Sequence, residues 1–314
     1  MPAVNVRGLE KSYGSLRAVD GVSFDVAPGR VFALLGPNGA GKTTTLEILE
    51  GFRSRDAGEV SVLGIDPGDR RFGQQLRSQL GVVLQELAVE PFLTVRHVLE
   101  RNAGYYPAPR EVAEVIELIG LAEQADRKVK TLSGGQQRRL DVGLGIIGNP
   151  ALLFLDEPTT GLDPAARRTS WELVRRLAGE GTTVILTTHY MEEAETLADE
   201  VAIIAGGRIV AHGPPDSLGG RDRGTATIRF RLPAGVSRED LPISVGGEGQ
   251  MGEVRTDREL EALYELTRWA LEHQVQLPGL TVTRHSLEEV YLELTGTDLE
   301  RLGGDPGRPE AVRG

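Results

Sequence analysis

Residues 36–43 of the chain read Gly36-Pro37-Asn38-Gly39-Ala40-Gly41-Lys42-Thr43. This stretch lies between a short apolar run, residues 31–35, and a helix-like pattern that continues to Leu49. It fits G-x-x-x-x-G-K-[ST], and a strand before it with a helix after it is the setting in which that pattern surrounds phosphates. Glycines let backbone N–H groups turn inward, and the helix N-terminus adds partial positive charge. We expect Lys42 to neutralise the outer phosphates of a nucleotide and the Thr43 hydroxyl to ligate Mg²⁺, although the loop alone does not separate ATPases, GTPases and small-molecule kinases.

Outward from this loop, short apolar runs alternate with helical patterns. Residues 31–35, 152–155 and 183–186 are mainly apolar, as expected for strands that are buried on both faces. Helical spacing follows over residues 42–49 and 167–178. Strands that alternate with helices predict an α/β fold with a mostly parallel sheet and helices on both of its faces.

Two carboxylates follow the second of these strands. The run at residues 152–155 ends in Asp156 and Glu157. Open α/β sheets bind ligands at the carboxyl ends of their strands, so this strand brings both carboxylates to the edge where the glycine-rich loop lies. We expect Asp156 to hold Mg²⁺, directly or through water, and Glu157 to accept a proton from an attacking water. A helix cap or a solvated pair at a strand end is the alternative.

His189 follows the third strand, after the polar residues Thr187 and Thr188. A lone histidine is more often structural than catalytic. Its place at the same sheet edge as Lys42 and Asp156 favours a role in the site, where it can donate a hydrogen bond to a γ-phosphate and help to orient the water.

A second anion-binding pattern occurs at residues 132–136, which read Leu-Ser-Gly-Gly-Gln and precede a helical stretch. Serine and two glycines at the start of a helix can bind phosphate, and one nucleotide needs only one such loop. The simplest arrangement is two subunits head to tail, each presenting Ser133 and Gly135 to the nucleotide of the other, because a two-fold axis makes the contact reciprocal. An ordinary helix cap is the alternative.

Taken together, residues 36–43, 132–136 and 152–157 and His189 resemble the ABC transporter ATPases, and the resemblance covers about residues 4–218. It implies a P-loop ABC ATPase domain with a mostly parallel core sheet, an antiparallel N-terminal sheet and a helical subdomain. It also implies ATP as the nucleotide, Mg²⁺ as its metal, and a homodimer that forms when ATP binds.

Three further residues receive roles through this resemblance. Tyr13 would stack on adenine, with an ordinary surface or core tyrosine as the alternative. Gln85 would touch Mg²⁺ and the attacking water and relay the state of the nucleotide to a membrane subunit, unless it is an ordinary loop residue. Asp163 would cross the dimer interface, unless it only caps a turn. The implied catalytic set is Glu157, His189 and Gln85, the metal set is Thr43, Gln85 and Asp156, and the nucleotide-binding set is Tyr13, Gly36, Pro37, Asn38, Gly39, Ala40, Gly41, Lys42, Thr43, Thr44, Ser133, Gly134, Gly135, Gln136 and Asp163.

The composition shifts near residue 219, where a Gly- and Arg-rich stretch indicates a linker. We expect the ABC ATPase domain over residues 1–220, with its helical subdomain over about 86–150, and a small α+β domain over 221–300. Residues 301–314 are expected to be disordered, because the stretch from Gly303 to Gly314 is rich in Gly and Pro. Residues 287–296, Leu-Glu-Glu-Val-Tyr-Leu-Glu-Leu-Thr-Gly, resemble the C-terminal extension of the daunorubicin-type multidrug resistance subgroup, with a plain amphipathic helix as the alternative.

Composition limits the other classes of function. The 314 residues include no cysteine, which excludes disulfides, cysteine-ligated zinc and thiol nucleophiles. The net charge of −11 makes nucleic acid an unexpected partner, because affinity for a duplex comes largely from neutralised phosphates. No apolar run is long enough to span a bilayer and no signal peptide is expected, so a membrane role would come through a partner.

The resemblance therefore favours the ATP-hydrolysing subunit of an exporter. Such a subunit would act on the cytoplasmic face of the membrane, through a separately encoded transmembrane permease, on a drug-like or lipophilic substrate. The short segment between Gln85 and Leu132 and the single phosphate-binding loop favour the transporter branch over chromosome-maintenance and translation-factor relatives. Two alternatives stay open: a soluble ABC ATPase that acts on nucleic acid or ribosomes, and a subunit of an ABC importer.

Overall fold

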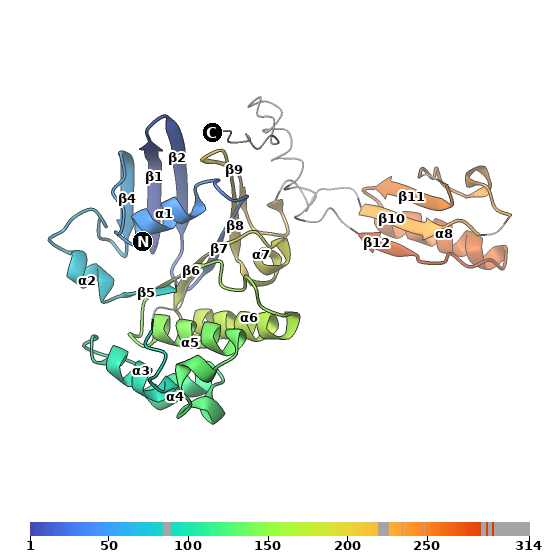
Figure 1. Cartoon of the computed structure of the whole chain (residues 1–314). Coiled ribbons are helices and arrows are strands. Elements are labelled where there is room, and N and C mark those ends of the chain that lie inside the picture. Colours follow the sequence, from blue (N-terminus) through green and yellow to red (C-terminus); the bar gives the residue numbers. More distant parts are fainter. Residues whose placement is uncertain are drawn as a thin grey trace, which may run out of the picture. The chain divides into compact units, whose positions relative to one another are not determined.

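The computed structural model describes residues 1–83, 89–218, 226–233, 235–247, 249–283, 287 and 291 (Figure 1). The chain divides into two compact units, residues 1–215 and residues 216–314. Gln85 lies outside the described residues.

A six-stranded sheet forms the centre of the first unit. Its strands lie in the order β5-β6-β7-β3-β8-β9. Neighbours from β5 to β8 run parallel, and β9 pairs antiparallel with β8. The strand order places the carboxyl ends of β3, β6 and β7 side by side, so the loops that follow these three strands meet at one edge. The strand bounds are β3 Val31–Leu35, β5 Leu80–Val83, β6 Leu152–Asp156, β7 Thr183–Thr188, β8 Glu200–Ala205 and β9 Arg208–Gly213.

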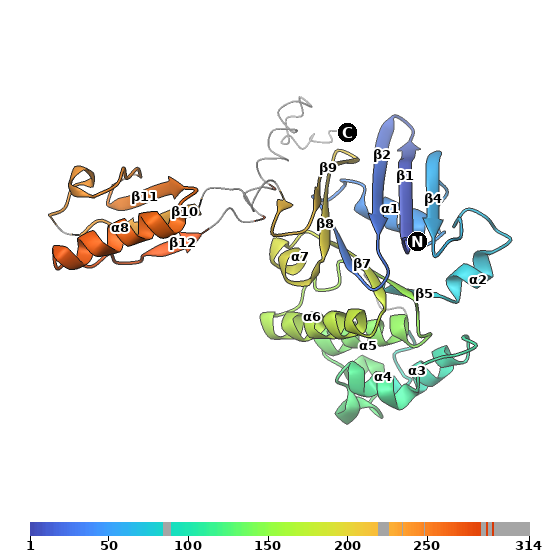
Figure 2. The ribbon, with the colours of Figure 1, turned by 180° about the vertical axis from the view of Figure 1, so that it is seen from behind.

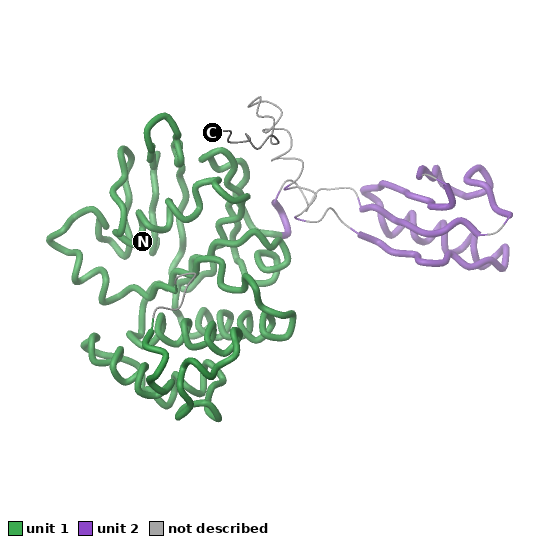
Figure 3. The backbone as a smooth tube through the Cα atoms, in the orientation of Figure 1, with its two compact units in different colours: residues 1–215 green, residues 216–314 purple. Residues whose placement is uncertain are grey.

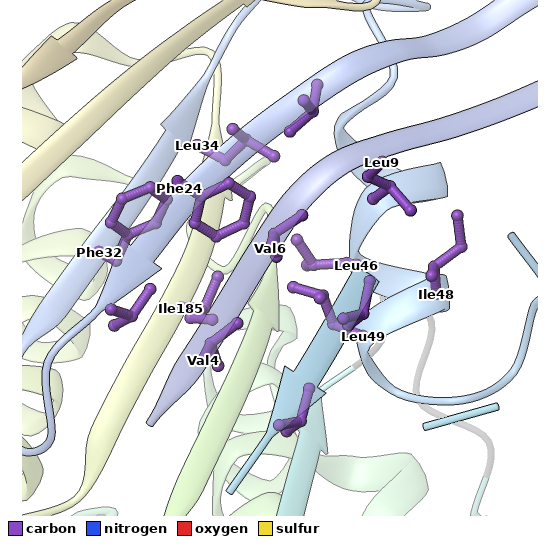
Figure 4. Close-up of a cluster of buried hydrophobic side chains, with 14 of the residues drawn as sticks. Val4, Val6, Leu9, Phe24, Phe32, Leu34, Leu46, Ile48, Leu49 and Ile185 are labelled. Carbon is purple, nitrogen blue, oxygen red and sulfur yellow. The ribbon is translucent and has the colours of Figure 1, made fainter. Parts of the chain in front are cut away.

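A second, antiparallel sheet with the order β2-β1-β4 covers the first on one side. Its strands are β1 Val4–Tyr13, β2 Leu16–Val26 and β4 Ala57–Val62. Helix α1, Lys42–Leu49, packs between the two sheets, and its Leu46, Ile48 and Leu49 share one buried cluster with the strands (Figure 4). In the same cluster the rings of Phe24 and Phe32 stack with centroids 4.8 Å apart. This packing fixes α1, and with it the loop that precedes α1, against the edge of the core sheet.

The remaining helices of the first unit lie on the other side of the core sheet and beyond its β5 edge (Figure 2). Helices α3, α4 and α5 contact one another, and α5 also contacts β5. Helices α6 and α7 contact each other and β7. Among the described residues, none of the helices combines the length and apolar character needed to cross a bilayer. The helix bounds are α2 Gly73–Arg77, α3 Val95–Ala103, α4 Val112–Leu118, α5 Gly134–Ile146, α6 Pro164–Gly179 and α7 Met191–Leu197.

The described residues of the second unit form a three-stranded antiparallel sheet with the order β11-β10-β12, packed against a helix (Figure 3). The strands are β10 Ala226–Arg231, β11 Met251–Thr256 and β12 Thr281–Thr283, and the helix is α8 Glu259–Glu272. Ile228 and Phe230 of β10 pack against Leu266 of α8 in a core of the unit's own. The fold class predicted from the sequence, a mostly parallel α/β core with an antiparallel sheet and helices, is confirmed.

Candidate functional site

The glycine-rich loop leaves the carboxyl end of β3 and closes onto the first turn of α1. Its backbone is left-handed at two glycines, with φ of 78° at Gly39 and 106° at Gly41, the residue before α1. A Cβ atom on Gly41 would lie 2.3 Å from the carbonyl oxygen of Ala18, and one on Gly36 would lie 2.4 Å from that of Ile204. Only glycine fits these two positions, and the resulting turn brings backbone N–H groups to the start of α1, where an anion is favoured.

Lys42 is buried against the loop that it follows. It is 5% exposed, and its Nζ donates hydrogen bonds to the carbonyl oxygens of Gly36 at 2.7 Å and Pro37 at 3.1 Å. Burial lowers the pKa of Lys42, and the negative charges of Glu157 and Asp156 oppose that change. Phosphate oxygens are stronger acceptors than backbone carbonyls, so this ammonium group is held where a phosphate could take over its hydrogen bonds.

Thr43 and Asp156, two of the residues predicted to ligate Mg²⁺, lie together. The hydroxyl of Thr43 is 3.4 Å from Oδ2 of Asp156, the last residue of β6. The hydroxyl of Thr187 donates a hydrogen bond to the other carboxylate oxygen and so orients Asp156. These oxygens fit Mg²⁺, which prefers hard ligands and keeps several coordination positions for water and phosphate. Gln85, the third predicted ligand, falls outside the described residues.

Glu157 follows β6 in an unusual backbone conformation, with φ of 46°. Its N–H donates to the carbonyl oxygen of Thr187 at 3.2 Å and to the hydroxyl at 3.1 Å. Its carboxylate accepts a hydrogen bond from the hydroxyl of Thr160 at 3.1 Å and lies 3.4 Å from Nδ1 of His189. That Nδ1 atom is buried and has no hydrogen-bond partner among the described residues. The structure thus brings Glu157 and His189, two of the three residues predicted for catalysis, into contact.

A cavity of about 280 Å³ opens over the glycine-rich loop. Tyr13, which is 39% exposed, lines it together with Glu157. The guanidinium of Arg53 lies 5.3 Å from the centroid of the Tyr13 ring. Adenine stacking on Tyr13 stays a prediction. The described lining residues are Tyr13, Leu16, Ala18, Asn38, Gly39, Gly41, Lys42, Thr43, Thr44 and Glu157.

Ser133 caps the N-terminus of α5. Its hydroxyl accepts a hydrogen bond from the backbone N–H of Gln136 at 3.3 Å, and the Gln136 side chain accepts one from the N–H of Ser133 at 2.9 Å. This capping box is the ordinary helix cap that was the alternative role for residues 132–136. Ser133 and Gly134 are nevertheless exposed, and a Cβ on Gly134 would meet nothing within 4 Å. The start of α5 is therefore capped but exposed on the surface, and its contact with a nucleotide stays a prediction.

Asp163 caps α6. Its Oδ1 accepts hydrogen bonds from the backbone N–H groups of Ala165 and Ala166, both at 2.9 Å. The turn-capping role considered for Asp163 is therefore present, and a contact across a dimer interface stays a prediction.

Sequence reasoning missed two polar residues near the acidic pair. Thr187 lies directly opposite Asp156 in the parallel β6–β7 register, which a count from the ends of the two apolar runs could have shown. Glu50 follows α1 and is 5% exposed. Burial, with smaller effects from the charges of Asp156 and Glu47, raises the pKa of Glu50 to about 7. In the sequence, Glu50 could have been noticed as a carboxyl residue that directly follows the apolar residues of an amphipathic segment.

The chain matches known families in both of its units. Residues 19–160 match the family described as ABC transporter. Residues 226–286 match the family described as ABC transporter domain-containing protein-like, C-terminal domain.

Curated relatives match over nearly the whole chain. A daunorubicin resistance ATP-binding protein of Streptomyces coeruleorubidus is 38% identical over 307 residues, which are 94% of this chain and 96% of the relative. A Nod factor export ATP-binding protein of Rhizobium sp. (strain N33) is 40% identical over 309 residues, which are 95% of this chain and 99% of the relative.

Solved structures also match over part of the chain. One, the ATP-binding subunit of an ABC transporter, is 26% identical with a TM-score of 0.62 and covers 68% of this chain and 91% of that chain. Another, an ATP-binding cassette of an ABC transporter in its ADP conformation, is also 26% identical, with a TM-score of 0.61 and the same coverage.

Proposed function

The chain belongs to the ABC transporter ATPases, and from this premise we propose that it is the ATP-binding subunit of an exporter. Two copies would close head to tail around two ATP molecules, and hydrolysis would reopen the dimer. That movement would drive a separately encoded transmembrane permease. Two relatives that match over nearly the whole chain are named as a drug-resistance protein and an export protein, and this supports export over import.

The observation that carries the dimer is the incomplete lining of the cavity. The glycine-rich loop, Tyr13 and Glu157 line it, and no residue of 132–136 is among the described lining residues. A γ-phosphate in the cavity would therefore have cationic and N–H donors on one side. The exposed start of α5 offers the missing donors, and a second copy can deliver them reciprocally about a two-fold axis.

The residues of one copy would divide the chemistry as follows. The loop N–H groups and Lys42 bind the β- and γ-phosphates. Thr43 and Asp156 hold Mg²⁺, which neutralises charge on the phosphate oxygens when it is bound. Glu157 takes a proton from the attacking water, and His189 donates a hydrogen bond to the γ-phosphate.

The partner copy would complete the site. Ser133 and Gly135 would contact the γ-phosphate across the interface, and Asp163 would lie at that interface. Gln85 would sense the metal and the water and pass the state of the nucleotide to the permease. We infer that the chain is bound at the cytoplasmic face of the membrane through this permease.

Transport in inside-out membrane vesicles tests the proposal. The membrane protein that copurifies with the chain is identified first, and the two are then produced together. Daunorubicin is the transported probe, because one relative is named as a daunorubicin resistance protein. We expect MgATP to drive the probe into the vesicles, and Lys42→Ala to abolish this uptake. ATP-driven release of the probe would indicate an importer. Hydrolysis that nucleic acid stimulates, with no copurifying membrane protein, would indicate a soluble ABC ATPase instead.

A further inference from the structure

Arg138 lies in the second turn of α5, and its side chain is buried against the loop that carries the acidic pair. The residue is 9% exposed. Its guanidinium donates hydrogen bonds to three consecutive backbone carbonyls, from Nε to Pro158 at 2.9 Å and from Nη2 to Asp156 at 3.0 Å and Glu157 at 3.2 Å. These carbonyls lie at the end of β6, where the hydrogen bonds between strands stop. The Arg138 guanidinium donates the hydrogen bonds that these carbonyl oxygens would otherwise lack.

The backbone at Glu157 depends on such support. A left-handed conformation is strained for a residue that has a Cβ atom, and it persists where the surroundings determine it. The N–H of Glu157 is held by Thr187, and its carbonyl is held by Arg138. Loss of the second contact would let this peptide relax toward an ordinary conformation. Because the side chain leaves from the same Cα atom, the carboxylate would then move away from His189.

The guanidinium is held in place from its other side as well. Its Nη1 lies 3.4 Å from Oδ2 of Asp141, one turn further along α5, and both side chains are largely buried. A buried charge needs such a partner. Arginine suits this place because its rigid fork can bind several carbonyls at once, whereas the lysine ammonium is a single point.

We propose that Arg138 is a positioning residue for ATP hydrolysis, which ties the helix that begins at Ser133 to the backbone of Glu157. The inference rests on the proposed function, because it takes Glu157 as the general base and Ser133 as the contact to the partner's ATP. Ser133 caps α5 and Arg138 lies five positions further along the same helix. A shift of α5 caused by the partner's nucleotide would therefore move Arg138, and with it the backbone of the chain's own acidic loop. Each protomer thereby couples the ATP that it completes to the ATP that it hydrolyses.

The test is Arg138→Lys in the full-length chain. Lysine keeps the charge beside Asp141, but its ammonium is a single point with three N–H donors and cannot span the three carbonyls and Asp141 as the planar guanidinium does. We expect kcat to fall at least about ten-fold while KM for MgATP changes less than about two-fold, because the transition state is affected and nucleotide binding is not. Binding of a fluorescent ATP analogue and the thermal unfolding midpoint are measured on the same samples.

Arg139→Lys is the matched control. Arg139 is the next residue of α5 and also binds backbone carbonyls, those of Ile119 at 3.2 Å and Gly120 at 2.8 Å, which are remote from the acidic loop. We expect its kcat to stay within about two-fold of the parent value. An equal loss of kcat in both lysine variants would overturn the proposal, because it would show a general effect on α5.

If Arg138→Lys does not fold, Arg138→Gln replaces it, since an amide can still bind one carbonyl. An inactive Glu157→Gln together with an Arg138 variant of unchanged kcat contradicts the inference about Arg138 alone. A fully active Glu157→Gln instead contradicts the proposed role of Glu157. The two failures are thus distinguishable.

Discussion

At the scale of single residues, Glu157 is held by contacts to both its carboxylate and its backbone. Thr160 and His189 contact its carboxylate, and Thr187 and Arg138 hold its backbone. Glu157→Gln preserves the shape of the side chain and removes its ability to accept a proton. We expect hydrolysis to fall by about 10²–10⁴-fold, as measured by phosphate release.

The same variant should still bind ATP and dimerise, because nothing else in the site is changed. Light scattering with and without MgATP checks this. The double variant Lys42→Ala, Glu157→Gln serves as the control and should stay monomeric. A Glu157→Gln protein that hydrolyses ATP at the parental rate would show that another group is the base.

Glu50 makes stability depend on pH. Its pKa is raised by burial to about 7, above the value of 4.5 for an unperturbed glutamate. Because the folded protein binds this proton more tightly than the unfolded chain does, its stabilising effect is complete below pH 4.5 and is lost as pH rises to about 7. Glu50→Gln avoids that loss, so without nucleotide it should be more stable than the parent by about 1–3 kcal/mol at pH 8 and by much less at pH 5.

Thermal or urea unfolding at the two pH values measures this difference. Glu123→Gln, at an exposed position in the first unit, is the matched control for the effect of the substitution itself. A Glu50→Gln variant that is destabilised equally at both pH values would show that the charged form of Glu50 is not penalised.

At the scale of elements, the glycine-rich loop is a rigid link between β3 and α1. Alanine at Gly41 would meet the carbonyl of Ala18 at 2.3 Å and would also adopt a φ of 106°. Alanine at Gly14, in the turn between β1 and β2, would adopt a φ of 58° with nothing within 4 Å. We expect Gly14→Ala to cost about 1 kcal/mol in the free energy of unfolding and Gly41→Ala at least about 2–3 kcal/mol, with loss of ATP binding.

Urea unfolding and binding of a fluorescent nucleotide measure these two effects. Equal costs at the two positions would mean that the contact with Ala18 relaxes freely and that the loop is not held by it.

The elements nearest the site were also the easiest to predict. Strands β3, β6 and β7 are short apolar runs because they are buried on both faces, and that pattern is visible without a structure. The loop before α1 fits the pattern G-x-x-x-x-G-K-[ST], which indicates a phosphate-binding loop. The positions of Lys42, Asp156 and Glu157 at one edge followed from these elements alone, and the contact of Glu157 with His189 agrees with that placement.

The contacts of Arg138 and the backbone conformation of Glu157 could not be predicted from the sequence, because they depend on packing between distant segments. Arg138 reaches carbonyls that are 18 to 20 positions away, and this requires knowing how α5 lies against the end of β6. The left-handed backbone of Glu157 has no sequence signal either, because glutamate rarely adopts it. The tip of the β1–β2 hairpin, residues 12–17, is exposed, so burial imposes no apolar pattern there that the sequence could reveal.

At the scale of the whole molecule, the two compact units have separate cores. The first contains the sheet edge with the nucleotide cavity, and the second builds its own core around Phe230 and Leu266. Within the first unit, the cavity and the exposed start of α5 are distinct places on the surface. In the proposed dimer, each such cavity is completed by the α5 start of another copy.

Mixing two inactive variants distinguishes a site shared between protomers from a site that one protomer completes alone. Lys42→Ala disables the phosphate loop, and Gly135→Asp sets a negative charge beside the phosphates at a position where the added Cβ has ordinary contacts, 3.4 Å from Ala166. In a heterodimer of the two, one shared site combines both defects and the other contains none. We expect each variant alone to be inactive and an equimolar mixture to recover about a quarter of the parental ATPase rate, since about half of the dimers hold one intact site of two. A mixture as inactive as its components, with heterodimers shown to form, would contradict a site shared between protomers.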